Sequence, residues 1–376
     1  MKRSLLAAAV LGLAISPAAA QVFKTELHDV TVETVASGFA HPWGLAFLPD
    51  RSMLVTERDG GLNLVGADGK TTKVAGVPRV WAGGQGGLMD VAADPDFARN
   101  RTIFLSYSEP SADGDDAGTA VARARLVLSQ TPRLQKVRVI FSMKRKSGGG
   151  RHFGSRIVIS PDKKLFITTG DRGQRERAQD PMDHAGKVLR INRDGSIPAD
   201  NPFADGAKGL PEIWSIGHRN AQGAIWNPRT RSLWTVAHGA RGGDEINRPE
   251  AGKNYGWPVI SYGKHYWGGS IGEGTAKPGM EQPVYFWDPS IAPSGMAFYT
   301  GDAFPRWKGN IFVGALKFQL LARLEVKDGK VVKEERLFGR EFGRIRDVRQ
   351  GPDGFLYLLT DERNGKLLRV RPPGTT

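Results

Sequence analysis

The sequence predicts an all-β protein, a six-bladed β-propeller, on three observations. The chain of 376 residues contains 48 glycines and 23 prolines, which suit many tight turns. Beyond residue 20, no long segment shows the spacing of apolar residues that is typical of a helix. Apolar strand-like segments recur in pairs, and a turn such as Pro-Asp joins each pair. Hairpins of this kind, repeated around an axis, build the blades of a propeller.

Six such hairpins follow one another at irregular spacing, each with an inner strand, a turn and a second strand. Their turns lie at residues 49–50, 94–96, 161–162, 227–228, 299–310 and 351–353. Six hairpins predict six blades. A strand near Val30 to Val35 would complete the last blade beside residues 367–370 and close the ring. A β-sandwich is the alternative architecture that this pattern leaves open.

The first 20 residues predict a cleaved secretory signal peptide. Lys2 and Arg3 precede an apolar run from Leu5 to Ile15, and three alanines end at Ala20. The run is too short to cross a bilayer as a helix of the mature protein. We therefore expect cleavage after Ala20, a periplasmic or secreted protein without an integral membrane segment, and one propeller domain over residues 21–376.

The chain has no cysteine, which excludes disulfide bonds and thiolate chemistry. Its formal net charge is +14, and removal of Lys2 and Arg3 with the signal peptide leaves +12. A basic exported protein could bind nucleic acid, an anionic membrane surface or a small anionic ligand. The basic residues are dispersed and form no nucleic-acid-binding motif, so we expect no nucleic-acid partner.

The most informative motif is Gly148–Arg156, which places His152 among glycines just before a predicted strand at Ile157–Ile159. Glycines allow a backbone or a ligand to approach closely. The flanking Arg151 and Arg156 would attract an anion and lower the pKa of His152, which keeps the imidazole neutral. A neutral histidine beside a bound anion suits a general base. A structural histidine in a turn is the alternative.

Other polar motifs also lie at the ends of predicted strands. Asp171, one hairpin after His152, could orient the imidazole and stabilise its protonated form, or it could belong to a surface turn. Gln85 lies in the glycine loop of residues 83–87. Four cations come from three different hairpins: Arg219, Lys317, Arg344 and Arg346. If they converge they would repel one another, unless a polycarboxylate binds them; exposed salt bridges are the alternative.

The segment His238–Asn247, followed by Asn254–Pro258, offers carbonyl and carboxylate oxygens. Such oxygens are the ligands of a hard cation, and calcium suits an exported protein without cysteine. An acid-containing turn is the alternative. Four aromatic residues nearby would either wall a flat ligand or a sugar or belong to the core: Trp257, Tyr262, Tyr266 and Trp267.

As an ordered set, these motifs resemble the soluble aldose sugar dehydrogenases that depend on pyrroloquinoline quinone (PQQ), the soluble glucose dehydrogenase and sorbosone dehydrogenase-like family. The set runs from His41 to about Val370, nearly the whole mature chain. Its members are Gly-Gln-Gly-Gly, Arg-His-Phe-Gly, Gly-Asp-Arg-Gly, Gly-His-Arg-Asn, Gly-Gly-Asp-Glu-Ile-Asn, Asn-Tyr-Gly-Trp-Pro, Ala-Leu-Lys and Arg-Ile-Arg. The resemblance implies a six-bladed propeller with PQQ over the central channel.

By this resemblance, His152 would be the catalytic base and Asp171 would support it. Glu245 and Tyr255 would bind a structural calcium ion, and the carbonyls of Gly239 and Ala240 would hold the calcium that polarises the quinone. Ten residues would contact or line PQQ: Gln85, Arg219, Asn220, Tyr266, Ala315, Leu316, Lys317, Arg344, Ile345 and Arg346. The glucose-dehydrogenase branch has proline at the position of Ala240 and carries long insertions, so the aldose branch is closer.

The resemblance implies oxidation of an aldose at C1 to a lactone, with the proton passing to His152 and a hydride to C5 of PQQ. The electron acceptor is unknown, and we expect a monomer or a weak dimer. Two alternatives remain. A calcium-dependent lactonase or esterase on a six-bladed propeller would need a central cation held by several carboxylates or asparagines. A non-enzymatic binding propeller would need neither the histidine nor convergent cations.

Overall fold

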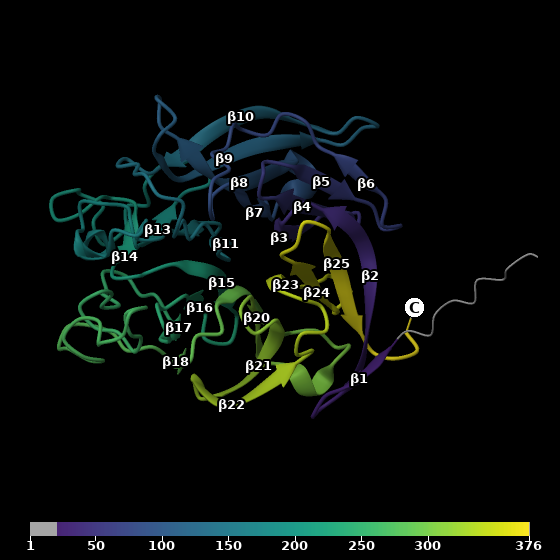
Figure 1. The fold of residues 1–376 in the computed structure, drawn as a ribbon. Helices are drawn as coiled ribbons and strands as arrows, with labels where there is room; N and C mark the ends of the chain where they lie inside the picture. Colours follow the sequence, from purple (N-terminus) through teal and green to yellow (C-terminus); the bar gives the residue numbers. More distant parts are fainter. Residues whose placement is uncertain (1–20, 376) are drawn as a thin grey trace, which may run out of the picture.

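The structure, a computed structural model, describes residues 21–375, so the predicted signal peptide lies outside the described residues. Six antiparallel sheets surround a central axis and form a β-propeller, which confirms the predicted fold (Figure 1). Five sheets have four strands and the sixth has five. Among the described residues, no helix is both long enough and apolar enough to cross a membrane.

Blades one to three follow the chain order, with the inner strand first. Blade one contains β3 (Pro42–Phe47), β4 (Met53–Glu57), β5 (Leu62–Val65) and β6 (Thr71–Lys73). Blade two contains β7 (Leu88–Ala93), β8 (Thr102–Pro110), β9 (Ala117–Val127) and β10 (Arg133–Ser142), with helix α1 (Phe97–Asn100) between β7 and β8. Blade three contains β11 (Ile157–Ile159), β12 (Leu165–Thr168), β13 (Val188–Ile191) and β14 (Ile213–Ser215), with the 3₁₀ helix η1 (Arg175–Gln179) after β12.

Blades four to six repeat this arrangement. Blade four contains β15 (Ala221–Asn227), β16 (Ser232–Ala237), β17 (Asp244–Asn247) and β18 (Tyr285–Trp287). Blade five contains β19 (Pro293–Phe298), β20 (Ile311–Ala315), β21 (Leu320–Lys327) and β22 (Lys330–Leu337), with the 3₁₀ helix η2 (Pro305–Trp307) after β19. Blade six contains β23 (Ile345–Gln350), β24 (Leu356–Thr360), β25 (Gly365–Arg371), β2 (Asp29–Phe39) and β1 (Val22–Lys24).

Blade six closes the ring because strands from both ends of the described chain share its sheet. Strand β2 pairs antiparallel with β25, and Val32 lies opposite Val370 (Figure 1). This confirms the pairing that the sequence predicts for residues 30–35 and 367–370. The inner strands stay at the edges of their sheets, and their arrangement around the channel leaves these edges short and protected.

The apolar core lies between successive blades. Leu54 of β4, Leu88 of β7 and Leu105 of β8 belong to one buried cluster that joins blades one and two. Strands that pack against neighbours on both faces carry long apolar runs, and every residue of β4 and β24 is buried. The outermost strand β22 carries mostly exposed or half-buried residues.

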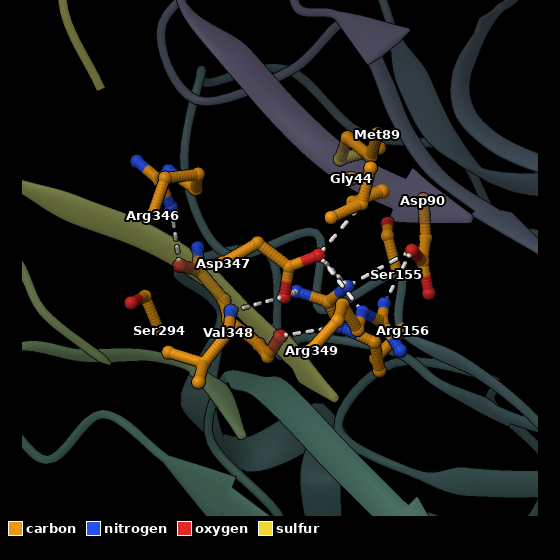
Figure 2. A network of polar contacts seen from close by, with 12 residues as sticks. Gly44, Met89, Asp90, Ser155, Arg156, Ser294, Arg346, Asp347, Val348 and Arg349 are labelled. Atoms are coloured by element: carbon orange, nitrogen blue, oxygen red, sulfur yellow. Dashed lines mark hydrogen bonds and ion pairs between the residues drawn. The ribbon is translucent and has the colours of Figure 1, made fainter. Parts of the chain in front are cut away.

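A buried network of charges fills the channel where the inner strands meet (Figure 2). Arg156 donates to Asp90 at 2.9 Å and lies 3.1 Å from Asp347, while its Nε donates to the Gln222 carbonyl at 2.9 Å. Arg349 donates to the same two aspartates, each at 2.9 Å. Two arginines and two aspartates balance in charge, as buried ionic groups require.

Backbone groups of further blades also bind these carboxylates. The amide of Leu45 in blade one donates to Asp347 at 3.2 Å, and the amide of Ile157 in blade three donates to Asp90 at 2.8 Å. In blade five, a Cβ on Gly295 would lie 2.1 Å from Asp347 Oδ1. Only glycine leaves room for the carboxylate there. The network therefore contacts all six blades.

We expect Arg156→Met to lower the free energy of unfolding by about 3–5 kcal/mol, because it would leave the buried aspartates short of positive charge. Equilibrium unfolding in urea would measure the loss. Arg99→Met is the matched control, because the Arg99 side chain is 79% exposed in its pair with Asp96, and exposed pairs contribute little. A loss no larger than that of the control would show that the network does not hold the blades together.

Candidate active site

The antiparallel blades bring two kinds of loop to one face of the propeller. The segment before an inner strand and the segment after the second strand lie at the same end of a hairpin. Gln85 precedes β7, His152 precedes β11, and Asn220 precedes β15. Asp171 follows β12 and Lys317 follows β20. Residues far apart in sequence therefore meet above the channel.

Arg172 holds the glycine-rich loop that carries His152. Its buried guanidinium donates to the carbonyls of Gly149 at 2.7 Å and Ser147 at 3.2 Å, and also to that of Arg151. The same group lies 3.5 Å from the ring centre of Phe153. Because these contacts hold the backbone before His152 and the Phe153 ring after it, His152 can keep a left-handed φ of 58°.

Two glycines allow neighbouring loops to pack against His152. A Cβ on Gly170 would lie 2.1 Å from the His152 carbonyl oxygen, and a Cβ on Gly84 would lie 2.3 Å from the Gly150 carbonyl oxygen. The glycine loop thus places Gln85 beside the histidine, where the Gln85 side-chain oxygen accepts a bond from the His152 amide at 2.8 Å.

His152 and Asp171 form a hydrogen-bonded pair, with 2.6 Å between Nδ1 and Oδ1. Asp171 also accepts bonds from the Gly173 amide at 2.7 Å on Oδ1 and from the Trp257 indole at 2.8 Å on Oδ2. An ionised Asp171 can only accept a hydrogen bond, so Nδ1 carries the proton of the neutral imidazole. Nε2 is then unprotonated and free to accept a proton.

The environment keeps His152 neutral. Burial is the main cause that lowers the pKa of His152; Asp171 opposes it, and Arg219 and Arg151 add to it. The expected influence of Arg156 was wrong, because that guanidinium binds Asp90 and Asp347 in the channel. Burial alone would raise the pKa of Asp171, but the bond and charge of His152 and the charge of Arg219 lower it.

A pocket of about 420 Å³ opens beside this pair. Eight of the sequence-predicted residues line it: Gln85, His152, Arg219, Asn220, Gly239, Ala240, Tyr266 and Lys317. Four further residues complete the lining: His238 and Arg241, from the segment predicted to bind a cation, and Ser290 and Ala292, which the sequence did not indicate. Asn220 also accepts a bond from the Gly154 amide at 3.0 Å, which ties it to the His152 loop. The pocket therefore places a neutral histidine beside several cationic side chains.

The four predicted cations do not have equal surroundings. Arg219 donates to the His238 carbonyl at 3.1 Å, and its buried Nε has no hydrogen-bond partner among the described residues. Arg346 is buried and pairs with Asp361, a residue outside the prediction. Arg344 lies 3.6 Å from the same carboxylate and is 45% exposed. Asp361 thus offsets the positive charge of Arg346 and Arg344, for which the sequence prediction named no acidic partner. Like Asp171, Asp361 follows the second strand of its blade, and this position could have identified it.

The three predicted apolar residues are buried beside these cations. Ala315 ends β20, Ile345 begins β23, and the Leu316 carbonyl accepts a bond from Arg344 at 3.3 Å. The aromatic residues differ from one another. Tyr266 and Trp267 are 70% and 81% exposed, so they are not core residues.

The predicted calcium ligands occupy two places. Gly239 and Ala240 line the pocket beside His152, whereas Glu245 and Tyr255 line a smaller cavity with Asn247; Gly239 lines both. Burial raises the pKa of Glu245 to about 7. Asn247 donates to Glu245 at 3.1 Å, and its buried Oδ1 has no partner among the described residues.

Tyr255 could offer only its carbonyl to a cation in this cavity. Its hydroxyl donates to the Arg248 carbonyl and accepts from the Glu250 amide at 3.0 Å, and its ring stacks on His218 at 4.8 Å. Across residues 21–375, no three His, Asp or Glu side chains gather in a metal-binding arrangement. A calcium ion would therefore depend on carbonyl and amide oxygens as well as Glu245.

Residues 39–369 match the family model of the glucose / sorbosone dehydrogenases. The chain belongs to this family, as the motifs predict. Aldose sugar dehydrogenase YliI of Escherichia coli (strain K12) is 47% identical over 347 residues, which cover 91% of this chain and 93% of that protein. A crystal structure of a glucose dehydrogenase has a TM-score of 0.88 and 48% identity, covering 90% of this chain and 99% of its own. The PQQ-bound form of aldose sugar dehydrogenase from Streptomyces coelicolor has a TM-score of 0.75 and 28% identity, covering 91% and 98%.

We expect Asp171→Asn to lower the pKa of His152 further, because the Asp171 carboxylate opposes the effect of burial. Arg219→Gln should raise it, because a positive neighbour disfavours the imidazolium. Nuclear magnetic resonance (NMR) titration of the protein without added cofactor would measure both, with His28, which packs on Phe304 and Trp307, as an internal reference. Shifts in the same direction would contradict this view of the site.

Proposed function

We propose that this protein oxidises aldose sugars at C1 to lactones, using PQQ and calcium, with His152 as the general base. One observation carries the proposal: the buried His152–Asp171 pair faces a pocket lined by cations. Membership of the glucose / sorbosone dehydrogenase family and the PQQ-bound relative support the same activity.

His152 would remove the proton of the anomeric hydroxyl through Nε2. Its depressed pKa keeps it neutral, so it can accept that proton at neutral pH. Asp171 would hold the ring in this orientation and stabilise the imidazolium as it forms. When bound, PQQ supplies the hydride acceptor and calcium polarises its reacting carbonyl.

The residues of the pocket fit an anionic, flat cofactor. Arg219 and Lys317 would bind its carboxylates, and the buried Nε–H of Arg219 is a donor available to one of them. Gln85, Asn220 and Tyr266 line the same space. Arg344 would bind from the side, while Arg346, Ala315, Leu316 and Ile345 would form the supporting wall. These assignments explain why so many cations gather beside one histidine.

The oxygen donors fit calcium at two positions. Gly239 and Ala240 would present carbonyls to the ion that acts on the cofactor. Glu245 and Tyr255 would hold the second, structural ion, and the unpartnered amide oxygen of Asn247 and the raised pKa of Glu245 support a cation site there.

The contacts in the channel and the pocket favour the two alternative functions, a lactonase and a binding propeller, less than sugar oxidation. A lactonase would need carboxylates free to hold a central cation, yet Asp90 and Asp347 are bound by Arg156 and Arg349. A binding propeller would not need a buried His–Asp pair beside cations. We further propose that residues 21–376 form one exported domain after cleavage at Ala20, a monomer or weak dimer with an unidentified electron acceptor.

We expect His152→Ala to reduce kcat for aldose oxidation about 10²- to 10⁴-fold, the usual contribution of a general base. The assay would couple oxidation to a dye with PQQ and calcium present. The affinity for PQQ should stay within a few-fold, because the anion-binding residues are unchanged. His28→Ala is the matched control, and near wild-type turnover of His152→Ala would disprove the assignment.

Calcium should raise the melting temperature of the protein, and Glu245→Gln should lose most of that increase. A ligand that binds only the native state stabilises it by about 2.7 kcal/mol at 100 times its Kd. Scanning calorimetry with calcium or magnesium would measure the effect without PQQ. Glu250→Gln is the control, since Glu250 is exposed nearby. Equal calcium-dependent increases in both variants would contradict the site.

A further inference from the structure

Trp257 contacts the catalytic pair although its role there is not explained by cofactor binding or by core packing. Its indole Nε1 donates to Asp171 Oδ2 at 2.8 Å, while Asp171 Oδ1 faces His152 Nδ1 at 2.6 Å. The Arg219 guanidinium lies 5.3 Å from the centre of the indole ring. Trp257 therefore touches both the carboxylate that orients His152 and a cation of the pocket.

The backbone of Trp257 is fixed on both sides, so its indole is held in place. Its amide donates to the Gly217 carbonyl at 3.0 Å, and its carbonyl accepts from Gln179 at 2.7 Å. Gln179 and Asn254 exchange two side-chain bonds, at 2.7 and 3.1 Å. A Cβ on Gly217 would lie 2.3 Å from Asn254 Oδ1, so glycine permits this close packing.

We propose that Trp257 is a positioning residue, whose indole N–H fixes the Asp171 carboxylate and limits how strongly it draws the proton of His152. A donor on Oδ2 shares the negative charge of the carboxylate. Without it, Asp171 would be a stronger acceptor for the Nδ1 proton and would favour the imidazolium. The plane of the Asp171 carboxylate would also be free to rotate about its remaining contacts with His152 and Gly173.

The other charged groups around the pair act through separate contacts. Arg219 and Arg151 are the cations that influence His152, and Asp171 is its one ionised partner of opposite sign. His238 also lies close enough to interact with His152, and burial keeps His238 neutral by lowering its pKa well below the usual range. Trp257→Phe changes none of these charges and keeps a ring beside Arg219, so it isolates the indole N–H.

The experiment is an NMR titration of His152 in wild-type and Trp257→Phe protein without cofactor, together with pH profiles of kcat and KM for the loaded enzyme. We expect the pKa of His152 to rise in the variant. The acid limb of the kcat profile should move to higher pH, and kcat should fall about tenfold through lost orientation, with little change in KM. The kinetic part rests on the proposed function, whereas the titration does not.

Trp214→Phe is the matched control, because its indole donates to the Pro249 carbonyl at 3.0 Å outside the pocket lining. It should move neither the pKa nor the profile. In an Asp171→Asn background, Trp257→Phe should no longer shift the pKa of His152. If Trp257→Phe does not fold, the indole N–H resonance of the wild-type protein should titrate together with His152.

An unchanged pKa of His152 in folded Trp257→Phe, or an indole resonance that does not follow His152, would overturn the proposal. Absence of sugar oxidation by the wild-type protein would instead refute the proposed function and leave the titration result standing.

Discussion

The ion pairs of Arg156 and Arg349 with Asp90 and Asp347 are the constraint on which the rest of the structure depends (Figure 2). Charged groups lose their hydration when they are buried, so each must find its partners in one geometry. Here the partners come from blades two, three and six, with backbone contacts from the others. A shift of one blade along the channel would separate a buried charge from its partner, and the network therefore fixes how the inner strands align.

This alignment determines where the chemistry lies. Because the channel network fixes the inner strands, it also fixes where the loops before the inner strands and after the second strands begin. Arg156 lies four residues after His152, and between them Gly154 packs so closely on Thr169 that a Cβ on this glycine would lie 2.7 Å from the Thr169 carbonyl carbon. The segment before β11 thus reaches the channel network through Arg156 and presents His152 to the pocket. A rigid inner ring with loops at one face can hold the side chains of a site in a fixed geometry.

Much of the fold could be predicted because its signals are local. Alternating apolar residues and Pro-Asp turns define hairpins within about 15 residues, and β2 was predicted beside β25 since a ring needs a last partner. His152, Asp171 and Gln85 were identified because they follow or precede those strands. Pairings across blades carry no such signal: Arg156 was expected to influence His152 but binds Asp90, 66 residues away. The bond from Trp257 to Asp171 spans 86 residues and likewise has no local signal. The pair of Arg346 and Asp361 is different, because both residues belong to blade six and the position of Asp361 after β24 could have indicated it.

The contrast between the channel and the pocket explains why the protein would need an anion. In the channel, two cations meet two carboxylates and little charge remains. Outside the pocket lining, Asp361 balances Arg346 and lies within 3.6 Å of Arg344. In the lining itself, the buried Nε of Arg219 is left without a partner among residues 21–375. Arg219 lines both this pocket and the smaller cavity of Glu245, and a buried donor without an acceptor is unfavourable. A carboxylate bound to this donor would remove that cost, so the proposed affinity for an anionic cofactor would rest on the same electrostatics that hold the blades together.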